Sequence, residues 1–194
     1  AEKYDVPNVY ENWEDIVVDE EIEVIHNCTP NYLHFKINKA VIESGKHILS
    51  EKPLTITSKE SAELLELLKK KKSANAVNYN YRFYPLLQHA RSMVEENEVG
   101  EIFLVHGHYL QDWLFLKSDY NWRLETEQSG KSRAIADIGT HWCDMAQFLT
   151  GSKITEVFAD LTTIHKKRNK PKKAAETFKG KEEKDNLEYD EVEI

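Results

Sequence analysis

The first eighty residues alternate short apolar segments with helical patterns, and this alternation restricts the fold more than any other feature. The apolar segments expected to be buried strands are 23–27, 47–50 and 76–80. Helical spacing between them predicts one helix capped by Thr29-Pro30 and closed by Gly45, and a second from Thr57 through Lys72. Thr57 and Glu60 have the spacing of a capping box. Strands separated by helices with such short connections run parallel with right-handed crossovers, so the sequence predicts an α/β domain.

The pattern changes near Tyr84. The segments that follow are expected to be a helix over 85–100, a strand over 101–111, a polar loop over 112–134, a helix over 137–150 and a strand over 154–163. Long strands with few helices predict an α+β domain with an open, largely antiparallel sheet. We therefore expect two domains, 1–83 and 84–194. The charged tail from Lys166 is expected to be a solvated or mobile loop.

Composition excludes several classes of function. The net charge of −8 argues against a nucleic-acid-binding chain, whose partner is a polyanion. No apolar run approaches the length of a membrane span, and the first residues lack a signal pattern. Cys28 and Cys143 form neither a disulfide framework nor a metal cluster by spacing. These features predict a cytoplasmic chain with reduced thiols and no metal.

Polar residues directly follow each predicted parallel strand. They are Thr29-Pro30-Asn31, Glu51-Lys52-Pro53 and Asn80-Tyr81-Arg82. Ligands of open parallel sheets bind beyond the carboxyl ends of the strands, so the three segments predict one binding edge. Pro53 restrains Lys52 to an extended geometry.

A second candidate group lies on the predicted helix that begins at Asp137. Asp137, His141 and Asp144 are spaced i, i+4 and i+7, which places them on one helical face. A carboxylate one turn from an imidazole can orient it for acid–base chemistry. On spacing alone, an incidental Asp–His pair is the commoner explanation.

Taken together, these motifs resemble the glucose-fructose oxidoreductase, inositol dehydrogenase and MocA family of nicotinamide-dependent dehydrogenases. The resemblance covers about residues 1 to 165 and rests on the segments 27–31 with His34, 45–53, 80–83, 121–123 and 137–141 with Asp144. It implies a Rossmann domain followed by a sheet domain that carries the substrate and often the oligomer interface. The partners it implies are a sugar or polyol substrate and further copies of the chain, as a dimer or tetramer.

The resemblance also implies roles for individual residues. Lys52, Asp137 and His141 match the family's catalytic and substrate-binding residues. In that chemistry His141 takes the hydroxyl proton, and the Lys52 ammonium stabilises the developing alkoxide. The residues that correspond to contacts with NAD or NADP are Thr29, Pro30, Asn31, His34, Glu51, Lys52, Asn80, Arg82, Trp122 and Arg123.

The chain departs from the family pattern in more than one respect. A Gly-x-Gly-x-x-Gly turn and the later strands of the sheet domain are absent, so we expect an internal piece of a longer enzyme that alone binds the cofactor weakly and is inactive. The sequence leaves the choice between NAD and NADP, and the exact substrate, open.

Two alternatives belong to other classes of function. A non-catalytic regulator that binds a nucleotide or a partner would keep the scaffold but tend to lose Lys52 or His141, and both are present. A metal-dependent hydrolase would use His106, His108, Asp137 and His141, since His106 and His108 share one strand face.

Overall fold

The computed structural model describes residues 1–172 and 188–193. The chain divides into two compact units, Ala1–Tyr79 and Asn80–Ile194. Each unit is described by itself. Within the described residues, no helix is both long and apolar enough to cross a membrane.

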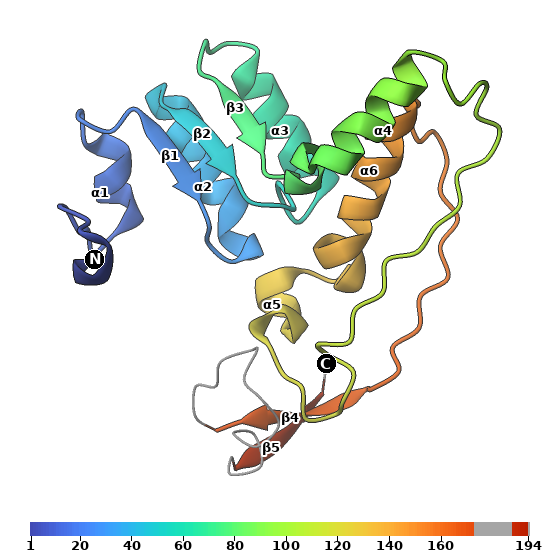
Figure 1. Cartoon of the computed structure of the whole chain (residues 1–194). Helices are drawn as coiled ribbons and strands as arrows, with labels where there is room; N and C mark the ends of the chain where they lie inside the picture. The colour runs from blue at the N-terminus through green and yellow to red at the C-terminus, as the bar shows by residue number, and fades with distance from the viewer. Residues whose placement is uncertain (173–187, 194) are drawn as a thin grey trace. The chain divides into compact units, whose positions relative to one another are not determined.

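The first unit is a parallel three-stranded sheet with helices (Figure 1). Its strands are β1 (Val24–Asn27), β2 (His47–Ser50) and β3 (Asn75–Val77), in that spatial order. Its helices are η1 (Glu2–Tyr4), α1 (Trp13–Val18), α2 (Asn31–Ser44) and α3 (Ser58–Leu68). Figure 1 shows α2 and α3 against the same face of the sheet, as two right-handed crossovers require. The predicted α/β architecture is confirmed.

The ends of the two main helices follow from local sequence. Thr57 accepts a hydrogen bond from the Glu60 amide, and the Glu60 carboxylate accepts one from the Thr57 amide, so the capping box is confirmed. Gly45 ends α2 with a φ of 83°, a left-handed conformation that glycine adopts without strain. The expected cap at Thr29 is wrong: α2 begins at Asn31 with Pro30 at the N-cap, and the Thr29 hydroxyl donates to Asn27 Oδ1.

The apolar core of the first unit lies between the sheet and its helices. It consists of Val17, Ile37, Val41, Ile42, Ile48 and Leu64. Alternation along β2 buries Ile48 and Ser50, while the helical period of α2 brings Ile37 and Val41 to one side. This packing fixes the strands whose carboxyl ends carry the predicted binding edge.

The second unit is built mainly from short helices. They are η2 (Asn80–Phe83), α4 (Pro85–Glu95), η3 (Trp122–Leu124), α5 (Thr126–Ser129), a π-helical turn η4 (Ile135–Gly139) and α6 (Thr140–Thr150). Helix α4 packs against α6. An antiparallel pair, β4 (Lys167–Pro171) and β5 (Tyr189–Glu193), completes the unit, with Lys167 opposite Glu193. The expected helix at 137–150 is confirmed, and its first turn is π-helical.

The sheet of the second unit differs from the prediction in its residues. The expected strands over 101–111 and 154–163 are wrong: these segments have no regular secondary structure. A strand exists only where a neighbour pairs with its backbone groups, and β4 and β5 are the paired strands among the described residues of this unit. The expectation of a loop from Lys166 is also wrong, since β4 begins at Lys167. The tail residues 173–187 lie outside the described residues.

Candidate functional site

The carboxyl edge of the parallel sheet presents polar side chains of several kinds. The β ladder continues beyond the strands, because the Glu51 amide donates to the Asn27 carbonyl at 2.9 Å and the Asn78 amide to the Ser50 carbonyl at 2.8 Å. Glu51 and Lys52 are half-buried and follow β2, and Thr29 is half-buried and follows β1. The predicted convergence is therefore present for the segments after β1 and β2, whereas the third predicted segment, Asn80-Tyr81-Arg82, belongs to η2 of the second unit.

A buried polar network lies directly beneath this edge. The side-chain nitrogen Nδ2 of Asn27 donates to Asn38 Oδ1 at 2.8 Å, and Asn38 Nδ2 donates to Ser50 Oγ at 2.9 Å. The Thr29 hydroxyl donates to Asn27 Oδ1 at 2.7 Å, which connects the exposed loop to the network. Because buried polar groups that lose a partner are costly, the network holds the loop after β1 in one position.

His34 joins the two loops at the edge. It is 1% exposed, and its ring nitrogens lie 2.6 Å from the Pro53 carbonyl and 2.8 Å from the Thr29 carbonyl. The nitrogen that carries the proton donates, and the tautomer decides which one it is. These contacts favour a positioning role for His34 over the direct cofactor contact expected from the resemblance.

The edge has the chemistry needed to hold part of a dinucleotide. A hydroxyl, a carboxylate and an ammonium group lie on Thr29, Glu51 and Lys52, and helix α2 begins at Asn31 directly beside them. Such groups fit ribose hydroxyls and an amide, and the amino end of a helix favours negative charge. These residues fit the cofactor implied by the resemblance.

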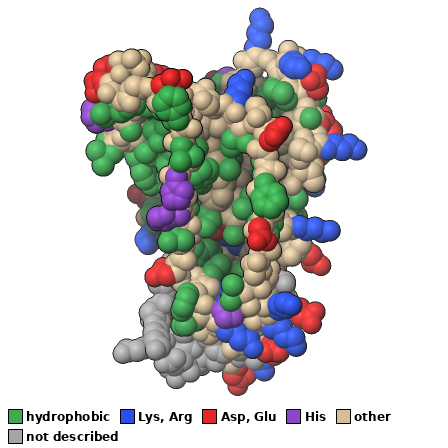
Figure 2. All heavy atoms as spheres, turned by 90° about the vertical axis from the view of Figure 1, so that its right-hand side faces the viewer, with side chains coloured by type: hydrophobic (Ala, Val, Ile, Leu, Met, Phe, Trp, Pro, Cys, Tyr) green, Lys and Arg blue, Asp and Glu red, His purple; other side chains and the backbone are tan. Residues whose placement is uncertain are grey.

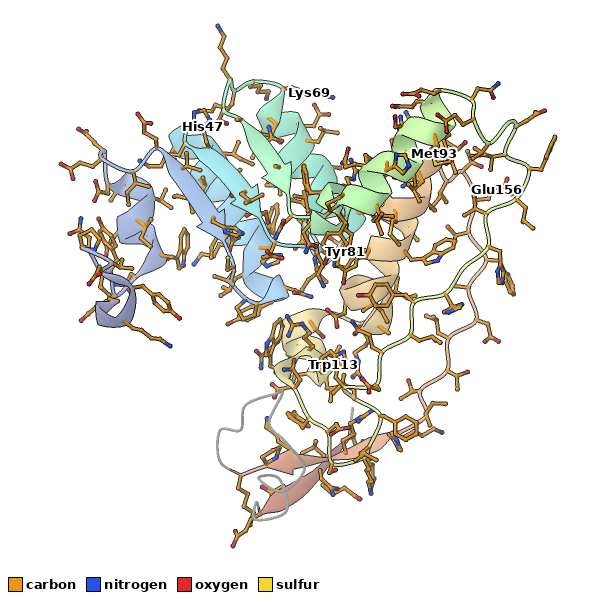
Figure 3. The ribbon with its side chains drawn as sticks, viewed as in Figure 1. His47, Lys69, Tyr81, Met93, Trp113 and Glu156 are labelled. Atoms are coloured by element: carbon orange, nitrogen blue, oxygen red, sulfur yellow. The ribbon has the colours of Figure 1, made fainter. Side chains whose placement is uncertain are left out.

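His141 lies in the second unit, in the first turn of α6, and is buried. The Tyr81 ring, labelled in Figure 3, stacks on the imidazole with ring centres 4.4 Å apart. The Tyr81 hydroxyl also contacts the Tyr109 hydroxyl. This hydrogen bond, followed by burial and by neighbouring tyrosines and Asp137, raises the pKa of Tyr81 to about 12. Tyr81 therefore stays neutral beside His141 at physiological pH.

Asp137 lies one turn before His141, in the π-helical turn. Its carboxylate is 3.4 Å from Nε of Arg123, whose guanidinium lies over the Trp122 ring at 4.6 Å. The Asn121 side chain accepts a hydrogen bond from the Arg123 amide and caps η3. The second unit thus brings Asp137, Arg123 and Trp122 together. π-helical turns occur frequently at functional sites.

A cavity of about 370 Å³ opens beside these residues. The residues that line it include Arg123, Asp137 and Trp113, the last of which is labelled in Figure 3. His141 does not line this cavity, although Ile138 does. The cavity has the size of a small-molecule site and carries groups that bind hydroxyls.

Two other residues expected to bind the cofactor, Asn80 and Arg82, belong to the second unit. Arg82 contacts other side chains of this unit. Its guanidinium makes a two-point contact with Asp144, including Nε to Oδ2 at 2.8 Å, and lies 5.3 Å from the centre of the Phe148 ring. This geometry favours a role in tying η2 to α6 over direct cofactor binding. Asn80 is exposed at the start of η2.

Arg168 is a buried residue that sequence reasoning missed. It is 8% exposed and donates to the carbonyls of Leu114, Leu116 and Asp119 at 2.7–3.0 Å. Burial lowers the pKa of its guanidinium. It also lines the cavity, and its hydrogen bonds to the three carbonyls fix the 114–119 loop. Its position within a run of basic residues gave no signal of burial.

The histidines of the proposed metal hydrolase do not converge. Among the described residues, the group of metal-ligating side chains whose ligand atoms approach one another is His26, Cys28 and Glu51. His106, His108, Asp137 and His141 are all described residues and form no such group. The geometry therefore offers no support for that hydrolase.

Family models match both units of the chain. Residues 1–79 match the oxidoreductase family with an NAD-binding Rossmann fold, and residues 87–185 match the GFO/IDH/MocA C-terminal domain.

Individual relatives agree with these matches. The chain is 38% identical to levoglucosan dehydrogenase of Pseudarthrobacter phenanthrenivorans over 164 residues, which cover 84% of this chain and 42% of that protein. It is 28% identical to D-xylose 1-dehydrogenase [NADP(+)] of Haloarcula marismortui, over 80% of this chain and 46% of that protein. A solved structure of levoglucosan dehydrogenase with NADH and levoglucosan matches with a TM-score of 0.75 at 38% identity, over 78% of this chain and 41% of that one. The chain spans less than half the length of these relatives.

Proposed function

The chain belongs to the GFO/IDH/MocA family of oxidoreductases, and from this premise we propose that its protein is an NAD(P)-dependent dehydrogenase. Its proposed substrate is a secondary alcohol of a sugar, inositol or related polyol. The observation that carries the proposal is the position of His141, which stacks on Tyr81 and lies one helical turn from Asp137. The same chain also has Lys52 at the sheet edge.

The proposed cofactor contacts lie at the sheet edge of the first unit. When bound, the nicotinamide accepts or supplies the hydride. Thr29, Glu51 and Lys52 would bind the ribose and nicotinamide end, while His34 holds their loops in place. Pro30 and Asn31, at the start of α2, complete the proposed contacts from this unit.

The proposed proton acceptor is His141. A neutral imidazole takes the proton of the substrate hydroxyl as hydride leaves the carbon that bears this hydroxyl, and it returns the proton to the oxygen in the reverse direction. The Tyr81 ring fixes the imidazole plane, and Asp137 holds a substrate hydroxyl or orients the imidazole. The Lys52 ammonium stabilises the negative charge that develops on the substrate oxygen. Trp122 and Arg123 complete the proposed group around Asp137.

The proposed substrate class is that of the relatives. The names of the two dehydrogenases given above contain levoglucosan and D-xylose, both carbohydrates with secondary hydroxyls. Asp137 and Arg123 on the cavity wall are a hydrogen-bond acceptor and donor suited to such hydroxyls. The choice between NAD and NADP, the oligomeric state and the cytoplasmic location stay predictions.

The test uses the protein expressed from its complete gene. Reduced nicotinamide is followed by absorbance with levoglucosan, D-xylose and myo-inositol, for the unchanged protein and for Lys52→Met and His141→Asn. Removal of an acid–base or charge-stabilising group lowers kcat by about 100-fold or more. Lys59→Met and His89→Asn, at exposed positions on α3 and α4, are the matched controls and keep full activity.

Two results would contradict the proposal. Turnover of either site variant within a few-fold of the unchanged protein would remove that residue from the mechanism. Tight cofactor binding without turnover of any polyol would instead identify a non-catalytic binding protein.

A further inference from the structure

Three different metal-ligating side chains meet at the carboxyl ends of β1 and β2. They are the His26 imidazole, the Cys28 thiol and the Glu51 carboxylate, and their ligand atoms all lie within 4.8 Å of one another. His26 Nε2 is 3.6 Å from Glu51 Oε1. Cys28 is a free, exposed cysteine.

The parallel register of the two strands brings these residues together. Side chains of an extended chain alternate between faces, so His26 and Cys28 share one face. His26 pairs with Leu49 and Asn27 with Ser50, and the hydrogen bond from the Glu51 amide to the Asn27 carbonyl continues this ladder. Glu51 therefore follows opposite Cys28, on the face that His26 also uses. The convergence is a property of the backbone and does not depend on one rotamer.

A neighbouring side chain orients the carboxylate. Asn78, which follows β3, donates from Nδ2 to Glu51 Oε1 at 2.6 Å. Hydrogen bonds of this kind hold metal-ligating carboxylates in place. The His26 and Glu51 side chains are 45% and 30% exposed, so an ion can reach the group from solvent.

We propose that His26, Cys28 and Glu51 form a binding site for Zn²⁺. Zinc accepts sulfur, nitrogen and oxygen ligands together, whereas Mg²⁺ and Ca²⁺ prefer oxygen alone. Zinc–ligand bonds of about 2.0–2.3 Å place tetrahedral ligand atoms about 3.3–3.7 Å apart. The 3.6 Å separation of His26 Nε2 and Glu51 Oε1 meets this requirement. The distances from Cys28 Sγ to these two atoms are at most 4.8 Å, so a movement of the thiol by about 1 Å brings it into range.

Coordination has a defined proton balance. The Cys28 thiol gives up its proton to solvent as its sulfur binds zinc, while the neutral imidazole and the carboxylate bind through lone pairs. Three protein ligands leave a fourth position for water or an external ligand. Glu51 is also a proposed cofactor contact, so zinc and the cofactor would compete for its carboxylate, but zinc binding itself requires no dehydrogenase activity.

The test uses cobalt as a spectroscopic probe and zinc as a competitor. The chain is reduced, freed of metal and titrated with Co²⁺. A cysteine ligand gives a sulfur-to-cobalt absorption band in the near ultraviolet, and tetrahedral geometry gives intense visible bands. We expect both, saturating at one equivalent and removed by one equivalent of Zn²⁺ but not by excess Mg²⁺.

Variants separate this site from adventitious binding. Cys28→Ser removes the near-ultraviolet band, and His26→Gln and Glu51→Gln each weaken zinc binding at least about tenfold, as does Asn78→Ala by releasing the carboxylate. Cys143→Ser, at the other free cysteine, and His47→Gln, on β2, are controls that keep the band and the affinity. Circular dichroism checks that each variant is folded.

The proposal is overturned by any of three results. These are a sulfur band that survives Cys28→Ser, a band lost in Cys143→Ser but kept in Cys28→Ser, and no zinc or cobalt binding at submillimolar concentration. None of these measurements involves enzymatic activity, so they leave the proposed dehydrogenase unaffected.

Discussion

Different interactions stabilise the interior of each of the two units of this chain. The first unit contains a contiguous apolar core of six buried residues under a parallel sheet. The buried hydrophobic residues described in the second unit are Leu124 and Ala136, and its buried polar residues are Asp119, Asn121, Ser129, His141 and Arg168. Burial of apolar area stabilises the first unit, whereas hydrogen bonds to backbone carbonyls and ion pairs carry more of the organisation of the second.

The second unit also exposes large apolar side chains. Those along 102–116 and 154–164 include Phe103 (86% exposed), Leu110 (81%), Val157 (81%) and Phe158 (96%). Figure 2, which faces the right-hand side of Figure 1, shows hydrophobic side chains at the surface there. A sequence pattern typical of half-buried strands therefore yields no sheet unless a neighbouring strand pairs with it.

The largest loss of stability is expected from a substitution in the apolar core of the first unit. Leu64 lies on α3 and is 1% exposed. Leu64→Ala removes apolar contacts and leaves a cavity, so it should lower the free energy of unfolding by about 2–5 kcal/mol. Its neighbour Leu65 is 57% exposed, so Leu65→Ala should change that free energy by less than about 1 kcal/mol. Hydrogen exchange of α3 amides measures the first unit by itself. Equal losses in the two variants would contradict a packed core at Leu64.

A polar residue has the corresponding role in the second unit. Arg168→Met removes the donors of three carbonyls and should cost about 1–3 kcal/mol, because those groups lose their partners. Lys166→Met, at an exposed position two residues earlier, is the control and should have little effect. Protection of amides from hydrogen exchange in 114–119 is the measurement. If both variants exchange alike, the buried guanidinium is not what holds this loop.

A smaller effect concerns the tyrosine beside His141. The raised pKa of Tyr81, from 10.0 to about 12, contributes stability below pH 10.0 that is lost as the pH rises through about 12. Tyr109→Phe removes the main cause, so the pKa of Tyr81 should fall towards 10.0. Tyr84→Phe removes a minor cause and is the control. Tyrosinate absorbance during an alkaline titration follows both. A titration unchanged by Tyr109→Phe would exclude the hydroxyl contact.

The smallest effect on stability is expected at the exposed apolar segments. Phe158→Ser should change the free energy of unfolding by less than about 0.5 kcal/mol, because the ring has few contacts to lose. The same change should reduce self-association, measured by sedimentation, if these side chains drive it. A loss of stability comparable with that of Leu64→Ala would mean that the ring is buried.

Local and periodic features of this chain were predictable from its sequence. The strand segments of the first unit, the capping box at Thr57 and the end of α2 at Gly45 all depend on residues a few positions apart, and the helices between the strands imply their parallel direction. The helix containing His141 followed from the same kind of pattern, although its π-helical first turn did not. Such features need only neighbouring residues and a buried face, which the sequence specifies directly.

Contacts between distant residues were decided by the tertiary structure. Cys28 meets Glu51 because of the register between β1 and β2, Arg168 is buried because the 114–119 loop wraps it with carbonyls, and Tyr81 stacks on His141 across sixty residues. The segments at 101–111 and 154–163 have the composition of strands and yet remain unpaired within the described residues. The sequence determined which segments prefer to be helical or extended, whereas pairing and burial depend on which distant groups satisfy one another's hydrogen bonds.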